Sequence, residues 1–352
     1  MSLEDLIVAR ISETGPMSVA QYMHECLLHP TYGYYTTRDP FGAAGDFITA
    51  PEVSQMFGEM IGLALAQAWL DQGAPAPFTL AELGPGRGVL MADILRATKG
   101  VPGFHAAAQI GLVEASGKLR AVQAEALSGF APRWMDTVAD LPDAPLFLVA
   151  NEFFDALPVR QFMHDGEVWR ERQVGLVEGA LAFGLAGPVA LEGVADREAA
   201  ARGDFAQSCA ALPVIMAEVE TRIARRGGAA LVVDYGDWRV TTDTFQAVKA
   251  HEQVDPLTTP GGADLTAHVA FEDLVRAAPA LVASQLTSQG VFLERLGITQ
   301  RAEALAAQMS GEALNTHVKA HRRLTHPQEM GSLFKTLAFV PKGAPMLPGL
   351  ET

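Results

Sequence analysis

The sequence contains few cysteines and few basic residues. Only Cys26 and Cys209 occur among 352 residues, so neither a disulfide framework nor a cysteine-based zinc site is predicted. Lysine and arginine total 26 against 41 aspartates and glutamates, which gives a net charge of −15. Binding to nucleic-acid phosphates needs a basic surface, so we predict no nucleic-acid partner. A basic protein surface or peptide suits this chain better.

Several other signals are absent. No uninterrupted apolar run is as long as a membrane span, so no membrane insertion is predicted. Glu4 and Asp5 stand near the N-terminus, where a signal or transit peptide would be basic. The histidines show no paired metal-ligand spacing such as H-E-x-x-H, so no metal is predicted. Ser54 and Ser116 lack the context of a nucleophile elbow, which argues against a hydrolase. The lack of a targeting segment and of a membrane span, with so few cysteines, predicts a cytoplasmic protein.

Apolar runs that alternate with helical stretches predict an α/β fold. With 49% hydrophobic and 19% charged residues, the composition is that of a globular protein. Strands followed by helices imply right-handed crossovers and therefore a mostly parallel, seven-stranded sheet. The predicted strands are 78–83, 109–114, 133–136, 146–150, 229–234, 281–286 and 333–340.

A helical segment, residues 1–76, precedes this sheet. Its first helix is expected from residue 3 to 12 because the apolar residues there share one face. Ser18 and Gln21 have the spacing of a capping box at the start of a second helix. Pro51 fits the first turn of a long helix that continues to about Leu70.

The regular alternation lapses between about 162 and 226. Residues 162–169 predict a hairpin that turns at Asp165-Gly166. Further strand-like and helical pieces follow, so we predict an inserted α+β subdomain at 162–226. The Rossmann-like core would then comprise residues 77–161 and 227–345.

Three glycines stand between the first predicted strand and a helix, at Gly84, Gly86 and Gly88. Glycine allows a sharp turn and a close approach to a ligand, and the helix that follows offers free N–H groups and its positive dipole end. A dinucleotide-binding loop would need glycine at the position of Val89. This argues against an NAD-dependent dehydrogenase. The spacing G-x-G-x-G, with Glu82 ahead of it, resembles the first motif of class I S-adenosylmethionine-dependent methyltransferases.

Acidic residues end the neighbouring strands, at the edge where a doubly wound sheet binds its ligand. Glu114 closes the second predicted strand, where a carboxylate can accept hydrogen bonds from both hydroxyls of a ribose. We favour this ribose role over a solvated strand end. Glu82 has two open interpretations: it orients the loop or a methionine amino group, or it only caps backbone N–H groups.

The segment that follows the strand at 146–150 carries an amide, two phenyl rings and two carboxylates. Asn151, Glu152, Phe153, Phe154 and Asp155 are expected where a transferable methyl group would lie. The alternative is that Asp155 caps the next helix while the phenyl rings pack. That alternative is weaker for Glu152, which directly follows the buried strand.

Two further segments join the candidate site. Asp234 and Tyr235 end another strand in the same layer, with a turn acid beside a core tyrosine as the equal alternative. Asp46, Thr49 and Glu52 precede the sheet and could close over the ligand as a lid. Thr49 is alternatively the N-cap of a helix, with Glu52 completing a capping box.

Several strings in the sequence together resemble the MidA-like family, which has bacterial and mitochondrial members. The resemblance spans about residues 1 to 345 and implies a class I methyltransferase fold. Its mitochondrial members are similar to this chain and act as assembly factors that symmetrically dimethylate an arginine on a core subunit of respiratory complex I. The matching strings are 45–54 (GDFITAPEVS), 82–88 (ELGPGRG), 151–159 (NEFFDALPV), 234–236 (DYG), 264–268 (DLTAH) and 330–335 (MGSLFK).

The resemblance implies a role for each matched residue. The cofactor would be S-adenosyl-L-methionine, bound by Glu82, Gly84, Gly86, Gly88, Glu114 and Asn151. The substrate or lid set would include Asp46, Thr49, Glu52, Phe154, Asp234, Tyr235 and His268. The family usually has an acid two residues after that histidine, and this chain has Ala270. Any substrate role that depends on the acid is therefore in doubt.

The leading hypothesis is methyl transfer to a protein arginine. Glu152 and Asp155 would hold the guanidinium by charge-assisted hydrogen bonds, and Phe153 or Phe154 would stack on its face. Asn151 completes the predicted catalytic set. Two alternatives stay open: a non-enzymatic assembly chaperone that binds the cofactor, and a small-molecule methyltransferase. The target arginine, and the choice between monomer and homodimer, are open as well.

Overall fold

The computed structural model describes residues 1–37, 49–191 and 200–352, and the chain forms two compact units. The first unit comprises Met1–Phe47, Asp155–Leu212 and Arg239–Ala270. The second comprises Ile48–Phe154, Pro213–Trp238 and Phe271–Thr352. Each unit has an apolar core of its own.

The second unit is built on a mostly parallel sheet. Its strands are β2 (Phe78–Leu83), β3 (Ala108–Val113), β4 (Arg133–Met135), β5 (Leu146–Asn151), β10 (Gly228–Asp237), β15 (Val282–Ala283), β16 (Thr287–Ser288) and β17 (Phe334–Val340). Among the described residues, seven of them follow one another in the order β15-β17-β10-β5-β2-β3-β4. The five from β10 to β4 are parallel, whereas β17 is antiparallel to β10, β15 and β16. The predicted fold class is confirmed.

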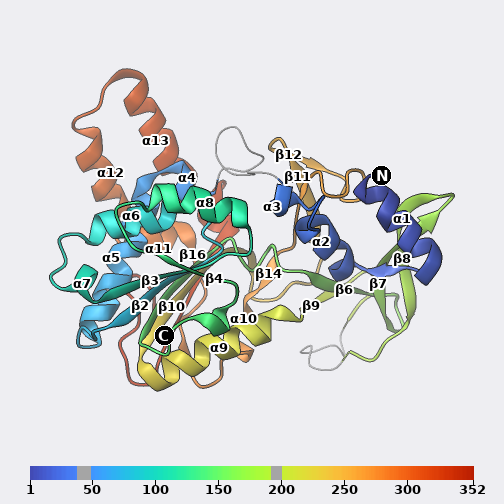
Figure 1. Ribbon diagram of the computed structural model, residues 1–352, viewed down its shortest axis with the longest axis horizontal. Helices are drawn as coiled ribbons and strands as arrows, with labels where there is room; N and C mark the ends of the chain where they lie inside the picture. Colours follow the sequence, from blue (N-terminus) through green and yellow to red (C-terminus); the bar gives the residue numbers. More distant parts are fainter. Residues whose placement is uncertain (38–48, 192–199) are drawn as a thin grey trace. The chain divides into compact units, whose positions relative to one another are not determined.

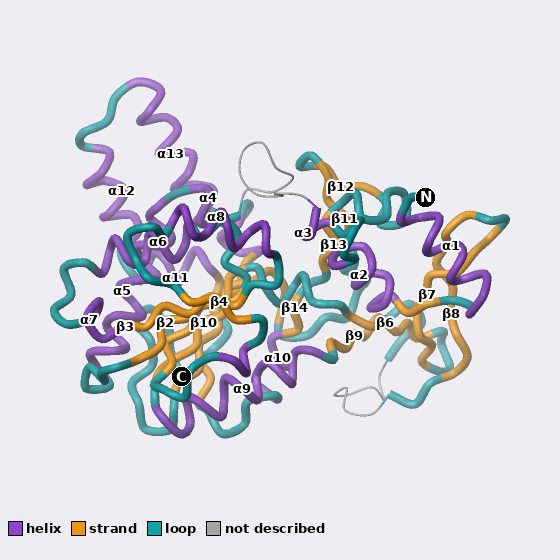
Figure 2. Tube along the Cα trace, in the orientation of Figure 1, coloured by secondary structure: helices purple, strands orange, loops and turns teal. Residues whose placement is uncertain are grey.

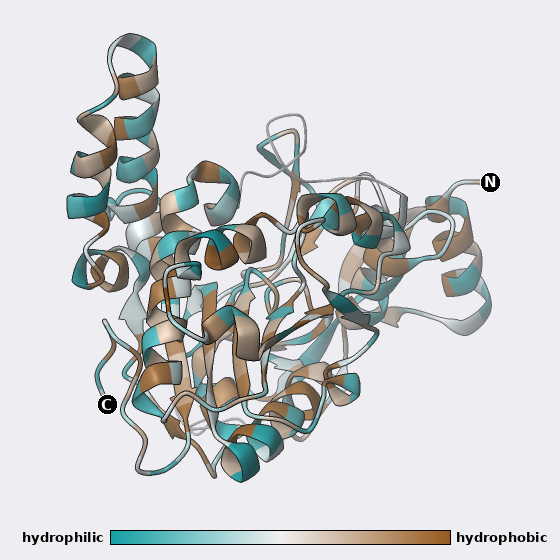
Figure 3. Cartoon of the chain, turned by 60° about the vertical axis from the view of Figure 1, so that its left-hand side comes forward, coloured by the Kyte–Doolittle hydropathy of each residue, from teal (hydrophilic) through white to brown (hydrophobic). Residues whose placement is uncertain are grey.

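Helices cover both faces of this sheet. They are α4 (Ala50–Val53), α5 (Gln55–Asp71), α6 (Val89–Thr98), α7 (Phe104–Ala107), α8 (Gly117–Ala126), η1 (Val138–Asp140), α9 (Ala211–Arg226), α10 (Phe271–Arg276), α11 (Gln289–Arg295), α12 (Ile298–Ala306), α13 (Gly311–Thr325) and α14 (Met330–Leu333). Figure 1 shows α6 and α8 along one face of the sheet and α9 and α10 along the other. α12 and α13 project from this unit as a helical hairpin (Figures 1 and 3).

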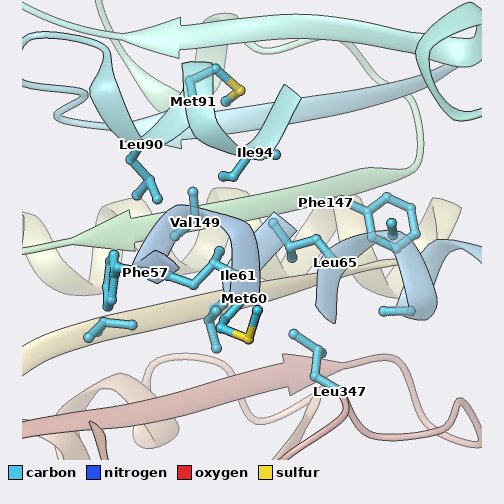
Figure 4. Packing of buried hydrophobic residues seen from close by; sticks show 14 of the residues in the cluster. Phe57, Met60, Ile61, Leu65, Leu90, Met91, Ile94, Phe147, Val149 and Leu347 are labelled. Carbon is cyan, nitrogen blue, oxygen red and sulfur yellow. The ribbon is translucent and has the colours of Figure 1, made fainter. Parts of the chain in front are cut away.

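The core of the second unit lies between α5, α6 and the central strands. Every residue of β2 and β5 is buried, because helices cover both sides of a parallel sheet. Figure 2 shows β2, β3 and β10 at the centre of the unit. Figure 3 shows the strands of the central sheet mainly in hydrophobic colours. Figure 4 shows the packing between the helices and β5, in which the labelled side chains include Phe57, Ile61, Leu90, Ile94 and Val149.

Two predicted elements of this unit are wrong in extent. The long helix expected from Pro51 to about Leu70 is divided at Ser54, whose backbone is extended and whose hydroxyl accepts the N–H of Met56 at 3.2 Å. Ser54 thus caps α5 and ends α4. The strand expected at 281–286 is reduced to β15, because the Ser284 hydroxyl accepts the Ala338 N–H at 3.0 Å and replaces a ladder bond.

The first unit joins the N-terminal helices to strands from the middle of the chain. Its elements are α1 (Leu3–Thr14), β1 (Met17–Ser18), α2 (Val19–Leu28), α3 (Tyr34–Thr37), β6 (Val159–His164), β7 (Trp169–Val177), β8 (Ala180–Pro188), β9 (Phe205–Cys209), β11 (Gln246–Lys249), β12 (Glu252–Val254), β13 (Asp264–Thr266) and β14 (Val269–Ala270). The predicted capping box of Ser18 and Gln21 is confirmed, as is the hairpin of β6 and β7.

The N-terminal helices of the first unit share an apolar cluster with its strands. β1 pairs with β7, and residues of α1 and α2 share an apolar cluster with Val159 and Val174. The N-terminal segment thus packs and pairs with strands of the region predicted as an insertion. The predicted domain boundaries stay a prediction. Among the described residues of the chain, no helix is long and apolar enough to cross a membrane.

Candidate functional site

The topology of the second unit brings the ends of β2 and β5 together. The chain runs outward from β2 to β3 and β4, and then returns to the other side of β2 as β5. At such a reversal of strand order the crossovers leave in opposite directions, so a crevice opens outside the carboxyl ends of the two strands. The loop after β2 and the segment after β5 meet there, because Leu83 pairs with Ala150.

The loop between β2 and α6 depends on its glycines. Gly84, Gly86 and Gly88 have φ angles of +60°, +52° and +81°, a region that side chains disfavour. A Cβ on Gly84 would lie 2.8 Å from Cδ2 of Phe153, so the loop also approaches the β5 segment closely. The three glycines predicted from the sequence therefore form one tight turn at the crevice.

Glu82 is buried near the end of β2 and serves α6. Gly88, the N-cap of α6, has no side chain that could accept a hydrogen bond from the first turn of the helix. The Glu82 carboxyl accepts one from the backbone N–H of Met91 instead. The pKa of Glu82 is raised to about 8, mainly by burial and in part by the nearby Glu114, while the Met91 N–H opposes both. Among the described residues, its buried Oε2 has no hydrogen-bond partner. The structure therefore supports the capping interpretation for one oxygen and leaves the other available to a ligand.

Glu114 follows β3 directly and is also buried. Its Oε1 accepts the N–H of Ser116 at 2.7 Å, and its Oε2 accepts Nε2 of Gln123 at 3.1 Å. Burial raises its pKa, while these two donors and the positive charge of Arg120 oppose the shift. The backbone N–H of Ala115 also donates to this carboxylate. A carboxylate has about four acceptor positions, so these three donors leave room for a ligand.

Asn151 and Glu152 end the central strand β5. Glu152 has a φ angle of +52°, which costs a residue with a side chain on the order of 1–3 kcal/mol. Its Oε1 accepts Nδ2 of Asn151 at 2.9 Å and the N–H of Ala50 at 3.2 Å. Within the described part of the chain, the buried Oδ1 of Asn151 has no hydrogen-bond partner. The carboxylate of Glu152, a residue with a strained backbone, thus lies beside the amide oxygen of Asn151, which still needs a hydrogen-bond donor.

Asp234 holds the turn that follows Glu152. It is buried in β10, and its Oδ2 accepts the N–H groups of Phe153 and Phe154 at 3.2 and 3.0 Å. Its Oδ1 accepts the N–H of Tyr235 at 2.9 Å. Tyr235 packs edge-on against Phe334 in the core. Asp234 and Tyr235 therefore support the turn after Glu152 through backbone hydrogen bonds and core packing.

The segment predicted as a lid is only partly described. Asp46 lies outside the described residues. Thr49 is the N-cap of α4, but its side chain makes no capping hydrogen bond, so the expected capping box with Glu52 does not form. The N–H of Glu52 is bound instead by the backbone carbonyl of Thr49 at 2.9 Å. The proposed contact of Thr49 and Glu52 with a ligand stays a prediction.

Asp155 and His268 belong to the first unit. Asp155 is buried, and its backbone carbonyl accepts the N–H of Ala267 at 3.0 Å. The N–H of His268 donates to the hydroxyl of Thr244 at 3.2 Å, and its carbonyl accepts Nε2 of Gln207. Their predicted roles toward the substrate stay predictions.

Three residues of the site were missed from the sequence. Gln123 and Ala50 contact predicted site residues, through a side chain and a backbone N–H, and Trp134 contacts Gln123. Gln123 stands in a largely polar helix, which gives no sign that this side chain is buried. Ala50 contributes only backbone, which a residue type does not reveal.

Comparisons with known proteins show the family of this chain. Residues 60–290 match a family model described as "Putative S-adenosyl-L-methionine-dependent methyltransferase". The chain belongs to this family. The predicted family, class of enzyme and cofactor are thereby confirmed, and the methyltransferase is supported over an NAD-dependent dehydrogenase.

Curated relatives match nearly the whole chain. Protein arginine methyltransferase NDUFAF7, mitochondrial, from Bos taurus is 37% identical over 95% of this chain and 82% of the relative. The Homo sapiens protein of the same name gives the same figures. The Drosophila melanogaster homolog is 36% identical over 97% of this chain and 85% of its own length. These mitochondrial names contradict the prediction of a cytoplasmic protein and point to the mitochondrion instead.

A solved structure shares the fold. It is a "likely methyl transferase from Burkholderia thailandensis bound to S-adenosyl-homocysteine", 29% identical, with a TM-score of 0.85. The alignment covers 99% of this chain and 93% of the other. The likeness extends over both compact units.

The residues at the crevice fit S-adenosyl-L-methionine. This cofactor carries hydrogen-bond donors on its amino group, its ribose and its adenine. The buried acceptors Oε2 of Glu82 and Oδ1 of Asn151 need such donors, because an unpaired buried acceptor is costly. The glycine turn also leaves no Cβ in the way of a ligand.

Proposed function

We propose that this chain is a protein arginine N-methyltransferase that symmetrically dimethylates an arginine on a core subunit of respiratory complex I. The relatives that carry the name protein arginine methyltransferase, at 34–38% identity, support an arginine substrate over the alternatives. The dimethylation and the complex I subunit come from the family resemblance. The single structural observation that carries the proposal is the orientation of Glu152.

The cofactor is proposed to lie across the ends of β2, β3 and β5. When bound, it supplies a methyl group that its sulfonium already activates. The glycine turn would contact the methionine part, Glu82 the amino group, and Glu114 the ribose hydroxyls. Asn151 and Glu152 would face the methyl-donor side. Among the described residues, the buried Oε2 of Glu82 and Oδ1 of Asn151 have no hydrogen-bond partner, which supports the assignments of these two residues.

Glu152 is held ready to accept hydrogen bonds from a cation. Nδ2 of Asn151 and the N–H of Ala50 both donate to Oε1 and fix the carboxylate. A guanidinium is planar and carries five donors, so a fixed carboxylate can bind two of its N–H groups. Binding in this way localises the nucleophilic lone pair on one nitrogen and places it in line with the methyl group, which is mainly a positioning task.

The neighbouring residues have distinct proposed tasks. Phe153 is partly exposed and Phe154 is buried, so Phe153 is the better candidate to stack on the guanidinium face. Asp155 is proposed as the second carboxylate of the substrate clamp. Asp234 would keep Glu152 in place through the amides of the turn.

The proposal is tested with purified core subunits of complex I as methyl acceptors. Radiolabelled S-adenosylmethionine and the wild-type chain should label one subunit, and amino-acid analysis should yield symmetric dimethylarginine. Glu152→Gln should lose most turnover, by roughly 100-fold or more, because it removes one charge-assisted acceptor. Its affinity for S-adenosylhomocysteine in calorimetry should be retained.

A matched control is available within the chain. Glu178, in the turn between β7 and β8, also has a φ angle of +52° and is exposed. Glu178→Gln should keep full turnover. Wild-type turnover by Glu152→Gln would refute the substrate clamp. Binding of S-adenosylhomocysteine without labelling of any subunit would favour the non-enzymatic chaperone, and labelling of a small amine alone would favour the small-molecule enzyme.

A further inference from the structure

The side chain of Gln123 connects two separate parts of the cofactor site. It extends from α8 and is fully buried. Its Nε2 donates to the backbone carbonyl of Gly86 at 2.8 Å and to Oε2 of Glu114 at 3.1 Å. A primary amide has two N–H hydrogens, so both are used, one on the glycine turn and one on the strand-end carboxylate.

Trp134 fixes which way this amide faces. Its Nε1 lies 2.8 Å from Oε1 of Gln123. An indole N–H can only donate, so its partner must be the amide oxygen, and the amide nitrogen must face the site. The reversed amide would place an oxygen against the Gly86 carbonyl and the Glu114 carboxylate, and would leave the indole facing a donor.

The glycine turn also packs directly on this part of α8. A Cβ on Gly88 would lie 3.4 Å from Cα of Gln123 and 3.5 Å from its Cγ, so the contact is close without being strained. Gly88 itself has a φ angle of +81°. The helix therefore supports the turn by contact, and the amide adds a directed hydrogen bond.

We propose that Gln123 is a positioning residue that couples the glycine turn to the ribose-binding carboxylate. It holds the Gly86 carbonyl and the carboxyl group of Glu114 in the arrangement that receives the adenosyl group. The proposal depends on the ribose role of Glu114 and does not depend on the identity of the methyl acceptor. The Glu114 carboxylate accepts hydrogen bonds from Ser116 N–H, Gln123 Nε2 and the backbone N–H of Ala115, and these donors favour its charged form.

The first test measures the affinity for S-adenosylhomocysteine across pH by calorimetry. Gln123→Leu should bind roughly 10- to 100-fold more weakly, because two acceptors lose their donor. Glu114 loses a donor to its charged form, so its pKa should rise. The fall in affinity on the acid side should therefore begin at a higher pH than in the wild-type chain.

A matched control separates positioning from a merely structural effect. Gln289 in α11 is also a fully buried glutamine, and its Nε2 donates to the Leu324 carbonyl at 2.9 Å. Gln289→Leu should lower stability as Gln123→Leu does, yet leave the affinity and its pH dependence unchanged. Wild-type affinity in Gln123→Leu at every pH would overturn the proposal.

Two further variants cover the remaining outcomes. If Gln123→Leu does not fold, Trp134→Phe keeps Gln123 but frees its amide to rotate, and should weaken binding by roughly 3- to 10-fold. Unchanged binding in that variant would overturn the coupling.

A double variant tests the same hydrogen bond from both sides. Glu114→Gln combined with Gln123→Leu should lose less binding free energy than the sum of the losses in the two single variants, because both substitutions act on one hydrogen bond. Wild-type binding by Glu114→Gln would refute the ribose assignment and the coupling, but would leave the arginine substrate untouched.

Discussion

Asp234 accepts the backbone N–H of Phe154 at 3.0 Å. The same oxygen accepts the N–H of Phe153 at 3.2 Å, so one buried carboxylate on β10 fixes the turn at the end of β5. Glu152 precedes these two amides and has a φ angle of +52°. The proposed substrate carboxylate is therefore held through the backbone by a residue from the neighbouring strand.

Replacing Asp234 by asparagine should disturb both stability and turnover. The asparagine side chain would keep one acceptor oxygen and place an NH₂ where an acceptor is needed. We expect unfolding free energy to fall by about 2–3 kcal/mol, measured by urea denaturation, and turnover to fall at the same time. Asp237→Asn, on the exposed end of the same strand, should stay within about 0.5 kcal/mol of wild type. Equal stability of the two variants would show that the turn does not need Asp234.

The backbone strain at Glu152 should be measurable as a difference between two variants. Glu152→Gly and Glu152→Ala both remove the carboxylate, but only alanine keeps a Cβ at a positive φ angle. The glycine variant should be the more stable by about 1 kcal/mol in urea denaturation, while both lose turnover. Glu178, with the same φ angle in an exposed turn, should give a similar glycine-to-alanine difference without any loss of turnover. An alanine variant as stable as the glycine variant would contradict the strain.

Removing one backbone N–H should uncouple Glu152 from α4. Ala50→Pro deletes the donor that lies 3.2 Å from Oε1 of Glu152. Proline is tolerated in the first helical turn, and the φ and ψ angles of Thr49, −71° and 162°, suit a residue before proline. Turnover should fall by roughly 10-fold, with S-adenosylhomocysteine affinity unchanged. Gln55→Pro, at the first position of α5, is the control and should retain turnover.

The features that were predicted from the sequence are those that local patterns encode. The apolar strands, the glycine turn and the capping box of Ser18 and Gln21 each depend on residues close together in the chain. The missed features depend on distant partners. Gln123 bonds Gly86, 37 positions away, and Ala50 bonds Glu152, 102 positions away. No periodicity or propensity reports such contacts, because they arise only when the sheet has assembled.

The same reason applies to the pairing between the N-terminal segment and the middle of the chain. β1 pairs with β7 across more than 150 positions, in the register of Met17 with Val174. A two-residue strand has too short a pattern to be recognised, and its partner was predicted only as one arm of a hairpin. Glu152 was predicted as a site residue from its place after a buried strand, but its positive φ angle follows from the Asp234 contacts and not from its residue type.

The buried Glu82 should make stability depend on pH in a direction opposite to that of a salt-bridged acid. Its pKa is raised to about 8 in the folded protein, against an ordinary value of 4.5 in the unfolded chain. Between these values the folded state holds a proton that the unfolded state has released. The contribution of Glu82 is therefore fully present below about pH 4.5 and is lost as the pH rises toward 8.

Glu82→Gln removes this titration and retains an oxygen for the Met91 N–H. From pH 5 to pH 8, the variant should gain roughly 3–4 kcal/mol of unfolding free energy relative to wild type, measured by urea denaturation at both pH values. Glu114, whose pKa is also raised, is present in both proteins, so its effect cancels in the comparison. Glu125→Gln, on the exposed face of α8, is the control, and its unfolding free energy should change between the two pH values by the same amount as that of the wild type. The unfolding free energy of Glu82→Gln could instead change between pH 5 and pH 8 by the same amount as that of the wild type. Glu82 would then be charged in the folded protein, and the site would stabilise its carboxylate before any cofactor binds.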